Sequence, residues 1–335
     1  MLIGVNEGDL SEDLSRVTGI GKYVRELVSR LREMRDDLNL EVKVVYNYRN
    51  ALSAIKSVVK GVLADFSTYD IVHFVSPKPF APLRRKVLIT TVHDLFFLKY
   101  RESGHPLLKK FYVENVLRSD AVIAVSSLIE EDLKRTINYK GKSFVVNLGI
   151  DEKFFNPSRT SERREKVRLK LGFVGRVDHE RKNLVRGIRT FKELKDENAV
   201  FEIWGAYDPG SKVFVRVRRE AEGDARVRFM GPAPEERIVE IYDSFDALFL
   251  PSIEEGFGLP ILEANARGVP VIVYEDARIP REVCKYCIRI KAELPSADEI
   301  LEYKQKFREE MIEFTRGFTW ANVAQRTYEI YKSLL

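Results

Sequence analysis

The chain has 335 residues, of which 44% are hydrophobic, so it can build two cores of ordinary size and is not a largely disordered chain. No run of residues approaches the ~18 consecutive apolar residues that a membrane-spanning helix needs. The net charge of +5 comes from 56 basic and 51 acidic residues. These charges are mixed along the chain, which argues against a nucleic-acid-binding protein, because such proteins gather their basic residues on one face.

The N-terminus and the cysteines bear on location. Polar and acidic residues, namely Asn6, Glu7 and Asp9, follow the first five residues, so we expect no signal peptide. Two cysteines cannot build a disulfide framework, and together these features predict a cytoplasmic protein. Charged residues make up 32% of the chain, a composition that resembles that of thermophile proteins.

Short apolar segments alternate with longer amphipathic segments through the first half of the chain. The predicted strands are 2–6, 41–46, 70–74, 87–92, 120–125 and 144–146, and the predicted helices are 21–34, 51–64, 106–118 and 128–136. Several of the strands are continuously apolar, which is typical of a parallel sheet that helices cover on both faces.

A polar, charge-rich segment, 151–170, interrupts this pattern and is predicted to be a linker between domains. The alternation then resumes with predicted strands 171–174, 200–204, 227–230, 247–250 and 269–274, predicted helices 183–195, 213–220, 234–242 and 260–267, and two helical pieces in 297–335 that separate near Gly317. The pattern predicts an α/β protein with two doubly wound, Rossmann-like domains. Ligands bind at the carboxyl ends of the strands in such folds, so we expect the domains to face each other across a cleft.

Two glycine-containing turns are candidate phosphate sites. Gly19 and Gly21 open a predicted helix, whose free N–H groups and dipole attract phosphate. The dinucleotide fingerprint and the P-loop pattern are both absent there, so an ordinary turn remains the alternative. Gly175 and Arg176 end a predicted strand and Lys182 precedes the next helix, so the two cations suit phosphate oxygens. Ordinary solvated charge is the alternative for this second turn.

The most specific motif is a loop and helix start that carries two carboxylates. Gly256 and Gly258, on either side of Phe257, permit a sharp turn, with Glu255 on the loop and Glu263 on the following helix. Ionised carboxylates are strong acceptors for the hydroxyl pairs of sugars, and no basic residue stands beside either one in the sequence. The alternative for Glu263 is a helix-terminal acid that the helix dipole stabilises.

Histidine and cysteine provide three further candidates. His93, which precedes Asp94 at the end of an apolar strand, is placed to donate hydrogen bonds or move protons, with a structural role as the alternative. His73 stands within a strand and is predicted to line the core. Cys284 and Cys287 form a lone C-x-x-C without the further ligands that zinc needs, so we expect a structural pair or a local disulfide.

These pieces, in this order, resemble glycosyltransferase family 4, whose members are retaining enzymes of the GT-B fold. Glu255 and Glu263, followed by Gly268–Ile272, look like the E-x7-E segment of that family, and residues 175–183 are similar to its second phosphate motif. Residues 120–126, 149–157 and 318–320 match further landmarks, so the resemblance spans about residues 19–335.

The resemblance implies a role for each candidate. Gly19 and Gly21 would approach the donor diphosphate from one domain, with Arg176 and Lys182 holding it from the other. Glu255 would face the donor sugar, Glu263 the ribose hydroxyls and His93 the transferred sugar. The residues assigned to catalysis are His93, Arg176, Lys182 and Glu255. Those assigned to donor binding are Gly19, Gly21, Gly175, Gly256, Phe257, Gly258 and Glu263.

The domain organisation also follows from the resemblance. The last helix of this family crosses back, so the N-terminal, acceptor-side domain would comprise residues 1–157 and 318–335. The C-terminal domain, which binds the nucleotide sugar, would comprise residues 158–317. Two domains joined by a linker suit closure on the donor, which excludes water.

The implied reaction moves a hexose, with mannose and glucose as candidates, from a nucleotide-diphosphate sugar to a hydroxyl of a sugar or lipid-linked acceptor. The chain has no D-x-D motif, so we expect no metal and no other cofactor. A GT-B-fold nucleotide-sugar epimerase and a non-catalytic nucleotide-sugar-binding protein are the alternative functions.

One stretch bears on the acceptor. Between Lys78 and Arg118, nine basic residues stand against three acidic ones and are interleaved with aromatic residues. Such a surface suits anionic lipid, so peripheral contact with the cytoplasmic membrane face is one expectation. A solvated charge cluster over buried aromatics is the other.

Overall fold

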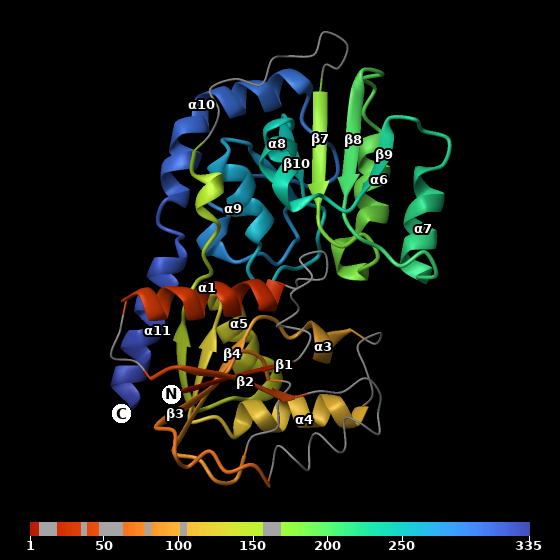
Figure 1. The fold of residues 1–335 in the computed structure, drawn as a ribbon. Helices are drawn as coiled ribbons and strands as arrows, with labels where there is room; N and C mark the ends of the chain where they lie inside the picture. Colours follow the sequence, from red (N-terminus) through yellow and green to blue (C-terminus); the bar gives the residue numbers. More distant parts are fainter. Residues whose placement is uncertain (7–18, 35–38, 47–62, 78–81, 101–105, 157–168) are drawn as a thin grey trace. The chain divides into compact units, whose positions relative to one another are not determined.

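The computed structural model describes residues 1–6, 19–34, 39–46, 63–77, 82–100, 106–156 and 169–335. The chain divides into two compact units, which are unit 1 (1–149 and 318–335) and unit 2 (150–317) (Figure 1). The boundary predicted at residue 157 lies a few residues after this division. None of the helices in the described ranges combines the length and apolar character that crossing a bilayer requires.

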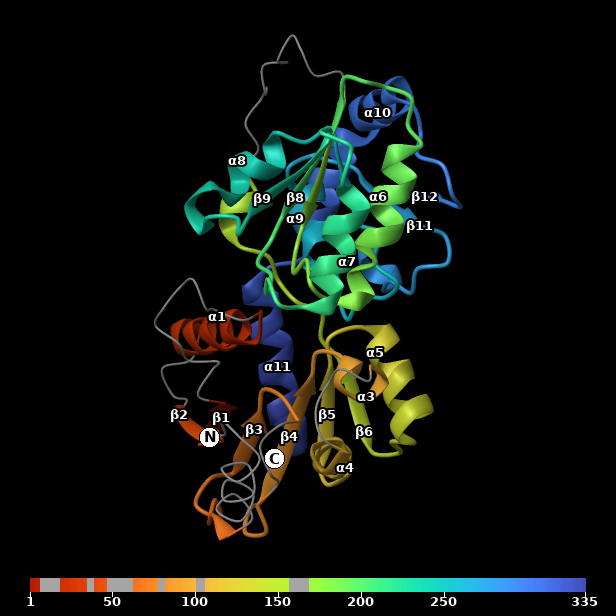
Figure 2. The same ribbon diagram turned by 90° about the vertical axis from the view of Figure 1, so that its right-hand side faces the viewer.

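Unit 1 is built on one parallel sheet with the strand order β2-β1-β3-β4-β5-β6 (Figure 2). Its strands are β1 (Leu2–Asn6), β2 (Glu41–Tyr46), β3 (Ile71–Phe74), β4 (Val87–Val92), β5 (Ala121–Ala124) and β6 (Lys142–Val145). Its described helices are α1 (Gly19–Met34), α3 (Phe96–Lys99), α4 (Pro106–Leu117), α5 (Ser127–Asp132) and α11 (Trp320–Leu334). The direction of strand addition reverses between β1 and β3, and open parallel sheets bind ligands beside such a reversal.

The last helix belongs to unit 1 because it packs against the first one. α11 lies against α1, although nearly the whole chain separates them in sequence (Figure 1). α1 buries Tyr23, Val24, Leu27 and Leu31, which form one stripe at helical spacing. An apolar stripe needs a partner surface, and α11 supplies part of it.

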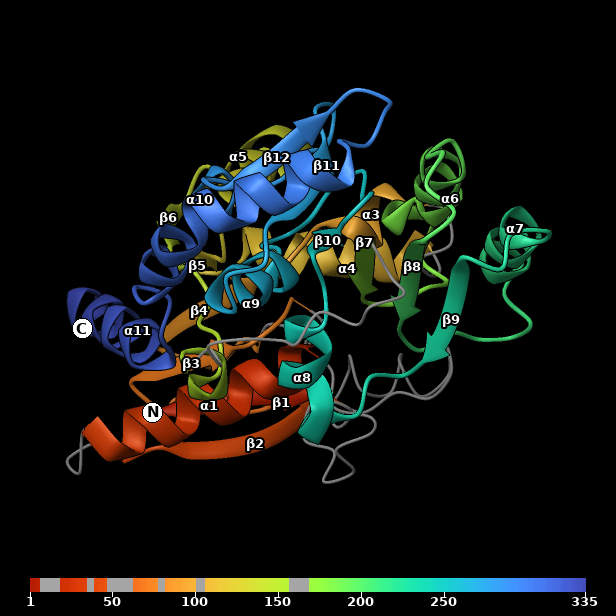
Figure 3. The same cartoon turned by 90° about the horizontal axis from the view of Figure 1, so that it is seen from above.

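Unit 2 has a second parallel sheet, in the order β12-β11-β10-β7-β8-β9. Its strands are β7 (Leu169–Val174), β8 (Ala199–Trp204), β9 (Val227–Gly231), β10 (Ala247–Phe249), β11 (Val271–Tyr274) and β12 (Cys287–Ile290). Its helices are α6 (Leu184–Lys192), α7 (Lys212–Ala221), α8 (Ile238–Asp243), α9 (Leu259–Ala266) and α10 (Ala297–Thr315). Read from β9 to β12, the strand order matches that of dinucleotide-binding domains. The direction in which successive strands are added reverses between β7 and β10. Figure 3 shows α6 and α7 on one side of this sheet and α8 and α9 on the other.

The predicted linker is wrong in its first residues. Residues 152–154 form a 3₁₀ turn, and Phe154 is buried in unit 2 with its ring 5.8 Å from that of Tyr242. Its carbonyl also accepts a hydrogen bond from Arg267. Phe154 is therefore part of the core of unit 2, which the polar residues around it in the sequence concealed.

Other element predictions differ in smaller ways. β12 was not predicted, and β7 begins at Leu169, inside the predicted linker. The predicted helix 128–136 is an α-helix up to Asp132 and continues as a π-helix to Ile137. Nearly all of the predicted helix 51–64 lies outside the described residues.

Candidate functional site

The loops that follow β7 and β10 lie at the reversal of the unit 2 sheet. The two strands are hydrogen-bonded neighbours and run in parallel, so both loops leave from the same edge. The first loop carries Gly175, Arg176 and Lys182, and the second carries Glu255. In open α/β sheets this position is the ordinary ligand site.

Lys182 and Glu255 form a buried ion pair at the centre of this arrangement. The Nζ atom of Lys182 lies 2.7 Å from Oε1 of Glu255, and each side chain is only 7% exposed. The hydroxyl of Ser252 donates to the same oxygen at 2.7 Å, and Nη1 of Arg181 lies 3.3 Å from the other oxygen. Both carboxylate oxygens are thus engaged, which holds the carboxyl group in one orientation.

The neighbours of Glu255 determine its charge. Burial by itself raises the pKa of the Glu255 carboxyl, but Lys182, Arg181 and the hydrogen bond from Ser252 outweigh this effect. The resulting pKa lies below the ordinary value, so the carboxylate is ionised at neutral pH. Burial also lowers the pKa of the Lys182 ammonium.

Glu255 has no basic residue beside it in the sequence, but the fold supplies two basic partners. Lys182 and Arg181 are more than seventy residues away along the chain, and the parallel sheet brings them into contact with it. Sequence reasoning also missed Ser252 and Arg181 as partners. The sequence signal was present, because Ser252 stands three residues before Glu255 and Arg181 stands beside Lys182.

Backbone hydrogen bonds join the loops around the ion pair. The amide of Ile253 donates to the carbonyl of Arg181 at 2.8 Å, which joins the loop after β10 to the loop after β7. On its other side, the amide of Glu255 donates to the carbonyl of Arg278 at 3.0 Å. The Arg278 side chain lies 3.4 Å from Glu254. The loop with Glu255 is therefore held on both sides.

Gly175 occupies a position where the backbone needs glycine. Its φ of 153° lies outside the range that most side chains adopt, and an added Cβ would lie 3.3 Å from the ring of Phe173. Gly205, at the end of β8, packs so closely that a Cβ there would lie 1.7 Å from the Gly175 carbonyl oxygen. Gly205 was not predicted, and it shapes the loop that carries Arg176.

Arg176 is held by an acidic neighbour. Its guanidinium makes two hydrogen bonds to Asp178, at 2.9 and 2.6 Å, while 47% of its side chain remains exposed. Burial alone raises the pKa of the Asp178 carboxyl, but the Asp208 amide and Arg176 together hold it below its ordinary value. The guanidinium is therefore partly oriented and still open to a ligand.

Gly256, Phe257 and Gly258 connect the loop to α9. Gly258 has a φ of 96° and immediately precedes the helix, while Phe257 is buried. A Cβ at Gly258 would lie 3.1 Å from Ile261, so both space and backbone conformation require glycine there. This sharp turn sets the start of the helix that carries Glu263.

Among the described residues, Glu263 bonds to a tyrosine of α8, whereas the Lys182–Glu255 pair bonds to Ser252 and Arg181. Glu263 accepts a hydrogen bond of 2.7 Å from the Tyr242 hydroxyl at the end of α8. Burial, and then the charge of Glu263, raise the pKa of Tyr242 well above its ordinary value, so the phenol stays protonated and donates. Tyr242 was not predicted as part of the site.

Unit 1 carries the other three predicted site residues. Gly19 is the first residue of α1 and is exposed, and an added Cβ would meet no atom of the described residues within 4 Å. Gly21 is buried in the same turn. His93 follows β4 and is half-buried, with Nε2 3.0 Å from the Val75 carbonyl oxygen. His73 is fully buried, as predicted.

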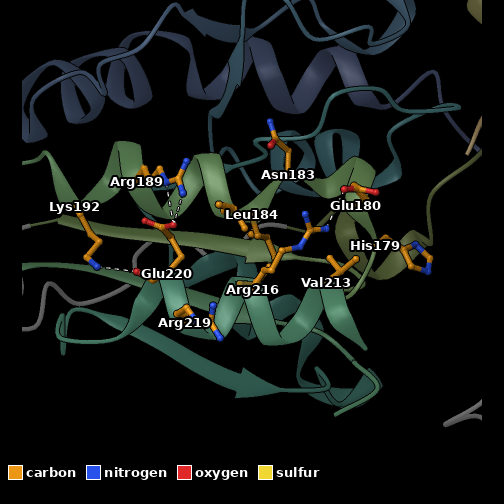
Figure 4. Close-up of a pocket in the computed structure, with 12 residues that line it drawn as sticks. His179, Glu180, Asn183, Leu184, Arg189, Lys192, Val213, Arg216, Arg219 and Glu220 are labelled. Carbon is orange, nitrogen blue, oxygen red and sulfur yellow. Dashed lines mark hydrogen bonds and ion pairs between the residues drawn. The ribbon is translucent and has the colours of Figure 1, made fainter. Parts of the chain in front are cut away.

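A groove of about 570 Å³ lies between α6 and α7 (Figure 4). Several basic side chains line it, but three of them already have partners on these helices or just before them. Arg189 pairs with Glu220, Arg216 pairs with Glu180, and Lys192 donates to the Glu220 carbonyl. We therefore assign this groove to the packing of the two helices and not to the site.

The C-x-x-C pair is present as two free thiols, Cys284 and Cys287, so the local disulfide is not formed. The amide of Cys287 donates to the Cys284 carbonyl at 3.2 Å, which closes a tight turn before β12. Of the two alternatives, a structural pair of cysteines therefore agrees with the structure.

The described basic residues between positions 78 and 118 are largely partnered. Four of them form ion pairs with acidic residues of unit 1, namely Arg84, Arg85, Lys86 and Lys99. Leu95 is buried, and the aromatic side chains at 96, 97 and 100 are half-buried. Because acidic residues neutralise these four side chains, the stretch between positions 78 and 118 offers less positive charge to an anionic lipid than the count of basic residues suggested.

Comparison with known proteins identifies the family. Two family models match consecutive parts of the chain, namely Glycosyltransferase Family 4 over residues 41–154 and Glycosyl transferases group 1 over residues 155–309. A D-inositol 3-phosphate glycosyltransferase from Corynebacterium glutamicum is 25% identical over 308 residues, which cover 80% of this chain and 73% of that protein. For the other corynebacterial proteins with this name, the match covers between 50% and 66% of the length of each protein.

Two further proteins match almost the whole chain. The O-antigen chain mannosyltransferase B of Escherichia coli is 23% identical, with 95% of this chain and 97% of that protein covered. Anabaena HepE, solved in complex with UDP and glucose, has the same fold, with a TM-score of 0.70 at 16% identity over 99% of both chains. Since both family models describe glycosyltransferases and together span residues 41–309, the chain belongs to the GT-B-fold glycosyltransferases of family 4, as its motifs predicted.

Proposed function

We propose that this glycosyltransferase moves a hexose from a nucleotide-diphosphate sugar to a hydroxyl of a sugar or lipid-linked acceptor. The observation that carries the proposal is the buried Lys182–Glu255 pair at the reversal of the unit 2 sheet, with Arg176 on the same loop as Lys182. The pair combines a cation for phosphate with a carboxylate for sugar hydroxyls. The family assignment supports the transferase over the epimerase and the non-catalytic alternatives.

The chemistry of the reaction fits these groups. Breaking the sugar–phosphate bond develops positive charge on the anomeric carbon and negative charge on the departing diphosphate. Arg176 and Lys182 would stabilise the diphosphate, and groups oriented before the reaction do so without reorganisation. Glu255, held by Ser252 and Arg181, would accept hydrogen bonds from the sugar.

Nucleotide binding is assigned to residues around the same loops. Glu263, oriented by the Tyr242 hydroxyl, would accept from the ribose hydroxyls. The turn Gly256–Gly258 and the backbone at Gly175 would allow the donor to approach closely. Gly19 and Gly21 would offer amides of the first turn of α1 to the diphosphate.

We further propose retention at the anomeric carbon without a metal ion. No residue in the sequence motifs offers a nucleophile opposite the leaving group, which favours front-face attack by the acceptor hydroxyl, assisted by the departing phosphate. The sequence has no D-x-D motif for a metal-bound diphosphate. The cationic side chains on the β7 loop would take the place of the metal.

A donor screen tests the function. UDP-, GDP-, ADP- and dTDP-sugars are compared in thermal unfolding, with EDTA present throughout. The true donor, at about 100 times its Kd, should raise the free energy of unfolding by ~2.7 kcal/mol, because it binds only the folded chain. The names of the relatives support glucose and mannose as the first sugars to try. Stabilisation by none of these donors would contradict the proposal.

The substitution Gly19→Ala tests whether Gly19 contacts the donor diphosphate or only forms a turn. The added methyl meets nothing within 4 Å in the part of the chain that the structure describes, so the free energy of unfolding should not fall. If the α1 amides hold the diphosphate, the methyl should raise the donor KM about tenfold, the equivalent of losing ~1.4 kcal/mol of binding. Gly317→Ala, where a Cβ also meets nothing, is the control and should leave the KM unchanged. Equal KM values for both variants would assign Gly19 to an ordinary turn.

The acceptor has two forms within this proposal. A lipid-linked acceptor would bring the protein to the cytoplasmic membrane face, through the basic stretch between Lys78 and Arg118. Salt-sensitive flotation with anionic liposomes supports that form, and its absence leaves a sugar acceptor in solution.

A further inference from the structure

We propose that Tyr23 is a positioning residue for His93, and that a buried hydrogen-bond chain through Thr91, His73 and Tyr331 holds Tyr23 in place. The inference rests on the proposed function, in which His93 contacts the transferred sugar. It adds residues that neither the motifs nor the family resemblance assigned. All of them lie in unit 1.

The chain of hydrogen bonds is continuous. The Tyr331 hydroxyl lies 2.7 Å from Nδ1 of His73, and Nε2 of His73 lies 2.7 Å from the Thr91 hydroxyl. The Thr91 hydroxyl lies 3.2 Å from that of Tyr23. The contacts connect α11, β3, β4 and α1, in that order.

Every member of this chain is buried. His73 and Thr91 are fully inaccessible, and the two tyrosines are 2% exposed. Burial, and the nearby His93, lower the pKa of His73 to about 3, so its ring is neutral at physiological pH. A neutral imidazole donates through one nitrogen and accepts through the other, which matches its two hydroxyl partners.

The chain ends at His93. The Tyr23 ring meets the His93 ring edge-on, with centroids 4.8 Å apart and an interplanar angle of 81°. On another side, Nε2 of His93 contacts the Val75 carbonyl. The imidazole is therefore held between a backbone carbonyl and a tyrosine ring, while part of it stays exposed for a ligand.

Packing of the core alone does not require a hydrogen-bonded hydroxyl at the Tyr23 position. A buried hydroxyl costs free energy unless it is hydrogen-bonded, and a phenylalanine would fill the Tyr23 position without that requirement. A fully satisfied polar network instead selects one geometry of the elements that it joins. Here it selects the position of the Tyr23 ring, and through it the orientation of His93.

A double-mutant cycle tests the inference. Tyr23→Phe, His93→Ala and the double variant are compared in kcat and donor KM, with a saturating acceptor. Tyr23→Phe is expected to lower kcat by about 3- to 10-fold with the donor KM nearly unchanged. In the His93→Ala background, Tyr23→Phe should lower kcat by less than about 2-fold, because His93, the residue that Tyr23 positions, is no longer present.

Tyr274→Phe in unit 2 is the matched control. It removes another buried tyrosine–threonine hydrogen bond, of 2.8 Å to Thr190, in the unit that does not contain His93. It should lose similar thermal stability without lowering kcat. Tyr331→Phe, at the far end of the chain, should lower kcat in the wild-type background and not in the His93→Ala background.

The outcomes distinguish the positioning role of Tyr23 from the role of His93 in the proposed function. Independent, multiplicative losses for Tyr23→Phe and His93→Ala would overturn the positioning role and leave the proposed function intact. An equal fall in kcat for Tyr274→Phe would likewise assign the effect to stability alone. Full activity of His93→Ala would instead overturn the role of His93 itself.

Discussion

Replacing Lys182 with methionine is expected to lower kcat by about 10²-fold or more, because a preorganised cation at the departing diphosphate is lost. The same change should lower the free energy of unfolding by about 3–5 kcal/mol, since the buried Glu255 carboxylate loses its closest cationic partner. Kinetics below the melting temperature, together with chemical denaturation, measure both effects.

The double variant Lys182→Met/Glu255→Gln distinguishes the two losses. Removing both charges takes away the buried carboxylate that has lost its Lys182 partner, so most of the stability should return. Activity should not return, because both the phosphate cation and the sugar acceptor are gone.

Lys170→Met provides a matched control. Lys170 lies at the start of β7, away from the site edge, and pairs with the buried Glu202 at 2.9 Å. This variant should lose stability and keep its kcat. If Lys182→Met and Lys170→Met reduced kcat equally, the ion pair of Lys182 would be structural only.

Arg176→Ala is the second change with a large expected effect. We expect kcat/KM to fall by about 10²-fold, because the guanidinium is placed to hold the diphosphate oxygens in the transition state. The free energy of unfolding should change by less than about 1 kcal/mol, since the side chain is 47% exposed and such ion pairs contribute little. Steady-state kinetics and thermal unfolding provide the two readouts.

Two further variants sharpen this test. Arg176→Lys keeps the charge and loses the planar fork, so it should recover only part of the activity. Arg186→Ala removes a comparably exposed arginine that pairs with Asp276 in the same unit, and it should leave kcat/KM unchanged. Similar losses for Arg176→Ala and Arg186→Ala would point to general surface charge and against a specific contact.

The sequence predicted the strands and helices best where their patterns were strongest. Continuously apolar strands required a parallel sheet with covered faces, and β7, β8 and β11 were found close to their predicted positions. β12 was missed, because it is only four residues long, lies at the edge of the sheet and includes the exposed Arg289, so it lacks the continuous apolar pattern of the central strands. The segment before residue 157 was misassigned because its polar residues hide one buried side chain, Phe154.

The sequence was enough to predict which residues belong to the candidate site, but it did not predict which of them contact each other. Gly258 could be identified from the sequence, since a sharp loop before a helix needs a residue that tolerates a positive φ. The partnership of Lys182 with Glu255 could not, because it depends on which strands are neighbours in the sheet.

What the sequence by itself determined is the set of local features, namely the alternation of strands and helices, the glycines at the turns and the spacing of Glu255 and Glu263. Each depends on interactions within a few residues, which a linear pattern records. Only the tertiary structure decided that Arg181 and Lys182 neutralise Glu255, that Tyr242 orients Glu263, and that the last helix supplies Tyr331 to His73. These pairings join residues from 21 to 258 positions apart, and strand order and side-chain burial, which create them, are properties of the folded chain as a whole.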